Sequence, residues 1–141
     1  MVKKDLIMGI AFMAMALIVL ACEDEDFGGG GASSHNTGKD CMGCHSDFKL
    51  AGSVYNQALS SAYAGATIKI TSQADGAGTV LATLTSDNTG NFHTGSAINF
   101  GTGVFVSVKG SSGSVKYMNS AITKGACNSC HGKTTSKIWA E

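Results

Sequence analysis

One five-residue pattern, Cys-x-x-Cys-His, occurs twice in this chain, at residues 41–45 and again at residues 127–131. Two cysteines at this spacing can add to the two vinyl groups of one porphyrin, and the histidine that follows is then held beside the iron as an axial ligand. A Cys-x-x-Cys pair by itself also suits a redox disulfide, a structural bridge or a Cys/His zinc site. Because a histidine follows both pairs, the sequence predicts two covalently bound haem c groups, with a zinc site as the alternative. The pattern assigns the thioether bonds to Cys41, Cys44, Cys127 and Cys130, and one axial position of each iron to His45 and His131.

Two further histidines are available for the remaining axial positions. The chain has four histidines, which leaves His35 and His93 outside the motifs. His35 lies in a glycine- and serine-rich stretch, where a solvated loop histidine is the simpler interpretation. His93 follows Phe92, and neighbouring strand residues face opposite sides, so a buried Phe92 would leave His93 pointing outward. We expect both histidines to be distal ligands and both haems to have low potentials; methionine, which would raise the potential, is available after the leader only as Met42 and Met118.

The first 21 residues have the pattern of an export signal. Lys3 and Lys4 precede an apolar run over residues 6–21 that is too short for a comfortable transmembrane helix. Residues 19–22, Val-Leu-Ala-Cys, resemble the lipobox of bacterial lipoprotein precursors, which implies cleavage before Cys22 and a lipid anchor on that cysteine. Several acyl chains together would hold the protein at a membrane. An ordinary signal peptide that happens to end at a cysteine is the alternative.

Composition divides the remainder of the chain. Residues 22–38 form an acidic and then Gly/Ser-rich tether. We expect a first haem-binding segment at 39–47, a β-sandwich at 48–122, and a second haem-binding segment with the tail at 123–141. All ten basic residues are lysines, they are balanced by ten acidic residues, and they form no basic stripe, so nucleic acid is not an expected partner.

Apolar residues in the middle of the chain follow the period-two pattern of short, half-buried strands. Glycine, serine, asparagine and aspartate separate these runs and act as turn signals. Five or six strands at such spacing predict a mainly β fold, a small antiparallel sandwich. We expect the alternating apolar residues, together with Met118 and the tyrosines, to pack in the core. The runs include Leu50 and Val54; Ala66, Ile68 and Ile70; Val80 and Leu84; Phe92; Val104, Val106 and Val108; and Val115 and Tyr117.

These strands resemble the carboxypeptidase regulatory-like domain, a prealbumin-type β-sandwich. The similarity lies in Gly-Ser-Val at 52–54, Ala-Gly-Ala-Thr-Ile at 64–68 and the stretch from Thr85 to Phe92, and it covers roughly residues 48–122. The proline that usually precedes the second of these elements is missing, because the chain has no proline. The resemblance implies a scaffold without catalytic activity.

The number of strands between the motifs decides whether the motifs are neighbours. An even number would return the chain to the same edge of the sandwich, and an odd number would leave the motifs roughly 23 Å apart, one strand length. In the even arrangement, we expect His93 at the edge away from both motifs, where it could reach a haem of a neighbouring molecule. This hypothesis predicts a possible head-to-tail homopolymer, which becomes a filament if the contact does not close.

Irons with two histidine ligands have no vacant position, so the predicted function is electron transfer without enzymatic activity. The chain resembles small multihaem lipoprotein cytochromes of anaerobic bacteria. This resemblance implies an exported protein at the outer membrane or cell surface, with other cytochromes or extracellular electron acceptors as partners. A dihaem reductase or peroxidase with an open iron site and a surface structural module braced by haem are the alternatives.

Overall fold

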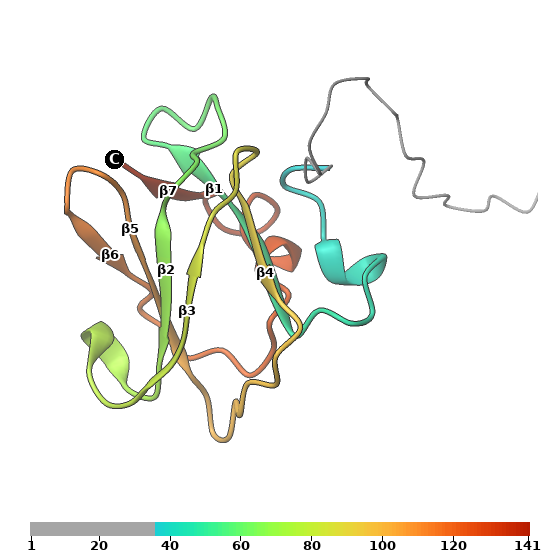
Figure 1. Ribbon diagram of the computed structural model, residues 1–141, viewed down its shortest axis with the longest axis vertical. Coiled ribbons are helices and arrows are strands. Elements are labelled where there is room, and N and C mark those ends of the chain that lie inside the picture. Colours follow the sequence, from blue (N-terminus) through green and yellow to red (C-terminus); the bar gives the residue numbers. More distant parts are fainter. Residues whose placement is uncertain (1–35) are drawn as a thin grey trace, which may run out of the picture.

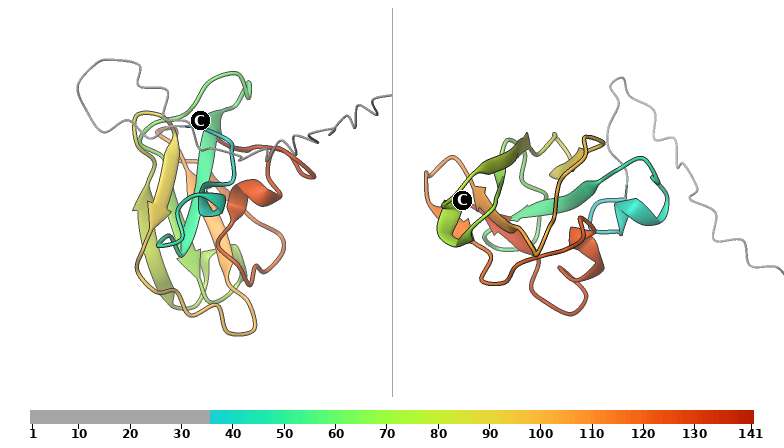
Figure 2. Two further views of the ribbon diagram at one scale, coloured as in Figure 1. Left: turned by 90° about the vertical axis from the view of Figure 1, so that its right-hand side faces the viewer. Right: turned by 90° about the horizontal axis from the view of Figure 1, so that it is seen from below.

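Two β-sheets packed face to face make up the computed structural model, which describes residues 36–141 (Figures 1 and 2). One sheet has the strand order β4-β1-β7 and the other β3-β2-β5-β6. The predicted small, mainly β sandwich is therefore confirmed. The strands are β1 (Leu50–Asn56), β2 (Thr67–Thr71), β3 (Val80–Thr85), β4 (Asn91–Thr94), β5 (Phe105–Lys109), β6 (Val115–Tyr117) and β7 (Ile138–Ala140). Three short 3₁₀ turns accompany them: η1 (Cys41–Gly43), η2 (Ala74–Gly76) and η3 (Cys127–Ser129).

The core lies between the two sheets and follows the alternating pattern of the sequence. Phe92 is buried with 2 % of its surface exposed, whereas His93 is exposed, as the alternation predicts. The core cluster draws side chains from both sheets and from the segments next to them: Leu50, Val54, Ala66, Ile68, Ile70, Phe92, Val104, Val108 and Ala140. Burial of each large side chain in this set contributes about 1.5–3 kcal/mol to folding.

Three residues that we expected in the core are exposed. Val80, Val115 and Tyr117 keep 49 %, 39 % and 43 % of their surface accessible. They lie on β3 and β6, the two edge strands of the four-stranded sheet, and each of these strands has a neighbour on one side only. An alternating pattern cannot reveal that a strand is at an edge, so the expectation was wrong at these positions.

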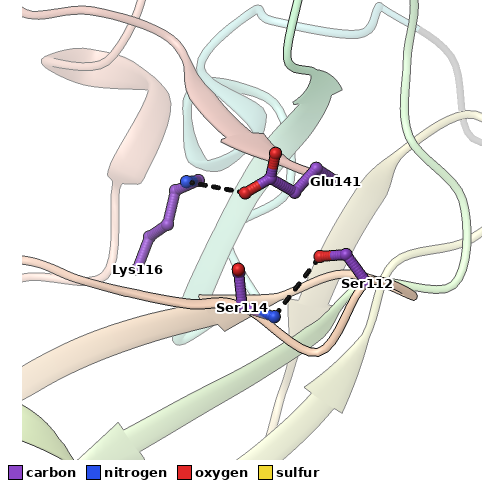
Figure 3. A network of polar contacts seen from close by, with 4 residues as sticks. All are labelled: Ser112, Ser114, Lys116 and Glu141. Atoms are coloured by element: carbon purple, nitrogen blue, oxygen red, sulfur yellow. Dashed lines mark hydrogen bonds and ion pairs between the residues drawn. The ribbon is translucent and has the colours of Figure 1, made fainter.

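The C-terminal tail contributes a strand that the sequence did not predict. β7 pairs with β1 in parallel, with Val54 opposite Ile138 and Asn56 opposite Ala140. Just beyond β7, the Nζ atom of Lys116 lies 3.4 Å from Oε1 of Glu141 (Figure 3). The backbone N–H of Ser112 also donates to the carbonyl oxygen of Glu141 at 2.9 Å. These contacts attach Glu141 to β6 and to the turn between β5 and β6.

Several predictions concern residues outside the described part of the chain. The signal peptide, Cys22, the tether before residue 36 and His35 are all among them. Within residues 36–141, no helix is long and apolar enough to cross a membrane.

Candidate functional site

The two Cys-x-x-Cys-His motifs fold in the same way. In the first, the N–H groups of Cys44 and His45 both donate to the carbonyl oxygen of Cys41, at 3.2 and 2.9 Å. In the second, the N–H groups of Cys130 and His131 donate to the carbonyl oxygen of Cys127, at 3.2 and 3.0 Å. Residues i and i+3 of a 3₁₀ turn lie on the same side, so this turn brings the backbones of both cysteines to one side of each motif.

Both motifs lie beside β1, next to each other (Figures 1 and 2). The backbone N–H of Ala51 donates to the carbonyl oxygen of Gly125, just before the second motif, at 2.9 Å. Gly52 permits the close approach of η3, since a Cβ atom at this position would lie 2.8 Å from Cβ of Cys127. Six strands separate the motifs along the chain, so the structure has the even arrangement in which the motifs are neighbours.

A buried polar network fixes the second motif to β1 and to the first motif. Asn128 lies inside the second motif and is 2 % exposed. Its Oδ1 accepts from the Ser53 N–H at 3.0 Å, and its Nδ2 donates to Ser53 Oγ at 2.9 Å and to the carbonyl oxygen of Lys39 at 2.8 Å. Ser53 Oγ in turn donates to Oδ1 of Asn91 on β4. Lys39 lies two residues before Cys41, the start of the first motif, so a hydrogen bond from Asn128 links the second motif to the segment that leads into the first.

An apolar cleft of about 320 Å³ opens beside the second motif, within the usual size range of ligand pockets. Its walls include Cys127, Cys130 and His131 of the motif. Its other lining residues come from β5, from the segment after β6 and from β7, and include Val106, Val108, Met118, Ile122, Lys124 and Ile138. The cleft thus combines an apolar lining with the two cysteines and the histidine of the second motif.

Within the described part of the chain, the hydrogen bonds of the His131 ring are made at Nδ1. Its Nδ1 lies 2.7 Å from the carbonyl oxygen of Ser136 and 3.2 Å from Oγ1 of Thr135. Because a carbonyl oxygen can only accept, Nδ1 carries the proton, and Nε2 is then the nitrogen with a free lone pair. A histidine that binds a metal through one nitrogen commonly donates from the other to a backbone carbonyl. The orientation of His131 therefore suits an axial iron ligand.

The sulfur of Cys127 is in an environment that favours an uncharged form. Desolvation of this half-buried side chain raises the pKa of the Cys127 thiol to about 12, and the neighbouring Cys41 adds to the shift. Burial likewise raises the pKa of the Cys41 thiol. A thioether carries no charge, so its formation at either position requires no burial of charge.

At the first motif, three aromatic rings are stacked. The ring of Phe48 lies between those of His45 and His93, with centroid distances of 4.6 Å to His45 and 4.2 Å to His93. The expectation that His93 lies far from both motifs is therefore wrong. β4 returns to pair with β1, with Ala51 opposite His93, and this pairing brings His93 to the end of β1 where the first motif is. Phe48 would have to move for His93 and His45 to bind one iron.

The cysteines differ in their present bonding. Cys41, Cys127 and Cys130 are free thiols, and Cys44 takes part in a disulfide. Since a thioether would use the same sulfur, haem attachment at the first motif requires that this disulfide be absent. Within residues 36–141, no three side chains of histidine, cysteine, aspartate or glutamate are grouped as a metal-binding cluster.

On another side of His131, lysines line a second cleft of about 280 Å³. We call it the lysine cleft; besides His131 it is lined by Thr37, Gly38, Lys39, Tyr55, Gly132, Lys133 and Lys137. The Nζ of Lys137 lies 4.2 Å from the centroid of the Tyr55 ring and donates to the carbonyl oxygen of Leu59 at 3.3 Å. The remaining cleft lysines, Lys39 and Lys133, are exposed.

Comparison with known proteins identifies no relative: no family model, curated protein or solved structure matches this chain. The resemblances to the carboxypeptidase regulatory-like domain and to multihaem lipoprotein cytochromes stay predictions. Sequence reasoning also missed Ser53 and Asn128. The only local signal for Asn128 was an amide side chain at a variable position of the second motif.

Proposed function

We propose that the chain is a dihaem c-type cytochrome that carries electrons outside the cytoplasm. The observation that carries this proposal is that two separate Cys-x-x-Cys-His segments adopt one turn geometry and lie side by side on β1. A β-sandwich does not need two such turns for its own stability, because its core lies between the sheets. Haem c, when bound, would supply an iron that changes oxidation state by one electron.

In this proposal each motif holds one haem. Cys41 and Cys44 bind the first haem and His45 is its proximal ligand, while Cys127 and Cys130 bind the second. His131 is the second proximal ligand, and its Nδ1 hydrogen bond to Ser136 leaves Nε2 for iron. The apolar cleft excludes water from one side of the second haem.

The remaining axial ligands and the location belong to the same proposal. His93 is the candidate distal ligand at the first motif, in the same molecule, after rotation of Phe48. His35 is the second candidate histidine. Export, the lipid anchor on Cys22, a place at the outer membrane or cell surface, and other cytochromes or extracellular electron acceptors as partners complete the proposal. Head-to-tail assembly is not part of it, because His93 lies beside the first motif of its own molecule.

Mass spectrometry of the mature protein, combined with a pyridine haemochrome assay, tests this function. We expect a mass increase of two haem groups and a c-type spectrum. The variant Cys127→Ala with Cys130→Ala should carry one haem fewer, and so should Cys41→Ala with Cys44→Ala. An unmodified mass, or zinc in place of iron by elemental analysis, would refute the proposal.

The spectrum of the oxidised protein separates electron transfer from an enzymatic function. Low-spin signals from both irons support a carrier, because no coordination position is then open to substrate. A high-spin signal that changes on addition of peroxide would instead indicate the reductase or peroxidase alternative.

A further inference from the structure

The cleft beside the second motif contains several side chains that can bind iron. Besides the two cysteines, they are the imidazole of His131, the thioether of Met118 and the amine of Lys124. In residues 36–141, the one histidine outside the two motifs is His93, and its ring is stacked on Phe48 at the first motif. The described lining of the apolar cleft therefore offers one histidine, His131, and two donors of other kinds, the thioether of Met118 and the amine of Lys124.

The backbone at Met118 is held at this cleft. Its N–H donates to the carbonyl oxygen of Val106 at 2.9 Å, which extends the pairing of β5 and β6 by one residue beyond Tyr117. The side chain is half-buried and shares the cleft wall with Val106 and Ile122. Met118 thus presents a polarisable sulfur from a fixed strand end in apolar surroundings.

The chemistry of the cleft favours Met118 over Lys124. Lys124 is exposed, and its ammonium group would have to lose a proton and its hydration before the nitrogen could bind iron. The thioether of Met118 is uncharged and carries its lone pairs at every pH. Its transfer from the cleft wall to the iron exposes no charge to the apolar lining.

We propose that Met118 is the distal iron ligand of the second haem, opposite His131. This inference rests on the proposed function and changes one part of it. The two haems are then unequal: the first has histidine at both axial positions and the second has histidine and methionine. Methionine ligation raises the reduction potential, so the second haem is the electron-accepting member of the pair, and the two low potentials expected from the histidine count become one low and one high.

Spectroscopy of the two-haem protein tests this ligand directly. The wild-type oxidised protein should show the weak long-wavelength absorption band of sulfur-bound ferric haem. The reduced protein should show the strongly shifted NMR methyl signal of an iron-bound methionine, and a redox titration should resolve two potentials. Met118→Leu should lose both signals. Met118→His should remain low-spin while the upper potential shifts down towards the lower one.

Met42→Leu is the control for loss of a methionine elsewhere, because Met42 is the half-buried methionine of the first motif, and this variant should keep the sulfur band. A wild-type spectrum without the band would overturn the proposal. So would a Met118→Leu variant that keeps the band. In either case, a high-spin iron in His35→Ala would identify His35 as the ligand. If the proposed function itself is wrong, the mass spectrum will distinguish that outcome, because neither the wild type nor any variant would carry covalent haem.

Discussion

At the scale of single residues, the position of His93 makes it a candidate ligand within its own molecule and not in a neighbouring one. Alternation along β4 correctly placed Phe92 in the core and His93 outside it. The pairing of Ala51 with His93 then brings the imidazole next to the first motif of the same molecule. In the proposed dihaem protein, ligation of the first iron by His93 in cis would need the Phe48 ring to move from its place between the two imidazoles.

Replacement of His93 by alanine should therefore change one iron and leave the assembly state unchanged. We expect half of the haem to become high-spin in the electron paramagnetic resonance spectrum. Sedimentation should give the same particle size as for wild type, because no contact between molecules is lost. Thr94→Ala, the next residue on β4, is the control and should keep both irons low-spin. Dissociation of an assembly in His93→Ala would instead support ligation between molecules.

The thiol of Cys127 makes the stability of the haem-free chain depend on pH. Its pKa is raised by burial to about 12 from an ordinary value of 9.0, so the folded state holds this proton more tightly than the unfolded state does. The stabilisation is complete below pH 9.0 and is lost as the pH rises towards about 12. In urea titrations of the haem-free protein, the unfolding constant should rise by up to about tenfold per pH unit more in wild type than in Cys127→Ala.

Cys130→Ala is the control for this comparison. Cys130 is exposed, and the variant keeps Cys127, so it should retain the wild-type pH dependence. Protein with haem attached to Cys127 has no thiol there and should behave like Cys127→Ala. Equal pH slopes in wild type and Cys127→Ala would contradict the environment that the structure gives this sulfur.

At the scale of elements, η3 is attached to β1 by a side chain from inside the second motif. Asn128 satisfies the N–H and Oγ of Ser53 and the carbonyl oxygen of Lys39. Without Asn128, the buried N–H of Ser53 loses its acceptor and the carbonyl oxygen of Lys39 loses a donor, whereas Ser53 Oγ keeps its hydrogen bonds to Asn91 and Gly38. The hydrogen bonds of Asn128 thus fix the position of the second motif relative to the first.

We expect Asn128→Ala to destabilise the protein by about 1–3 kcal/mol, the typical cost of unsatisfied buried polar groups. Ser129→Ala is the matched control at the next residue. Ser129 is exposed, its Oγ donates to the carbonyl oxygen of Ala126 at 2.6 Å, and the same Oγ lies 3.8 Å from Cys130 Sγ. We expect this substitution to destabilise the protein by less than about 1 kcal/mol. Chemical denaturation measures both values. In the two-haem protein, Asn128→Ala should also alter the circular dichroism that arises from two neighbouring haems, and unchanged stability and dichroism would disprove the role of Asn128.

At the scale of the whole molecule, positive charge lies close to both motifs. The whole chain is formally neutral, with ten lysines and ten acidic residues, so the local placement of the lysines decides the field near the motifs. Lys39 and Lys133 are exposed at the lysine cleft beside His131. A cluster of one sign at such a site raises the encounter rate with anionic partners, and salt screens the effect.

The double variant Lys39→Gln with Lys133→Gln should therefore slow oxidation of the reduced protein by ferricyanide. We expect a decrease in the bimolecular rate constant of roughly threefold to tenfold at low ionic strength, and little difference at high salt. Lys69→Gln with Lys109→Gln is the charge-matched control, since these exposed lysines lie on β2 and β5. Equal slowing by both pairs would show that only net charge matters.

Local sequence patterns determine the strands and the two motifs of this protein. The period-two runs indicated strands because side chains alternate along an extended backbone, and Ile68, Ile70 and Phe92 are buried accordingly. The repeated motifs gave the candidate cysteines and histidines because that chemistry depends on spacing along the chain. Strand order and edge positions depend on which distant segments pair. The sequence therefore did not predict that Val80 and Tyr117 are exposed or that β7 pairs with β1.

The sequence by itself determined the mainly β class and the two candidate attachment segments, because both depend on interactions between residues a few positions apart. Only the tertiary structure decided that these segments are neighbours on β1, that His93 lies beside the first, and that Met118 and Ile138 line the cleft of the second. Each of these arrangements comes from pairing between residues far apart in the chain, and the free energy of that pairing arises from burial and hydrogen bonds that no local pattern contains.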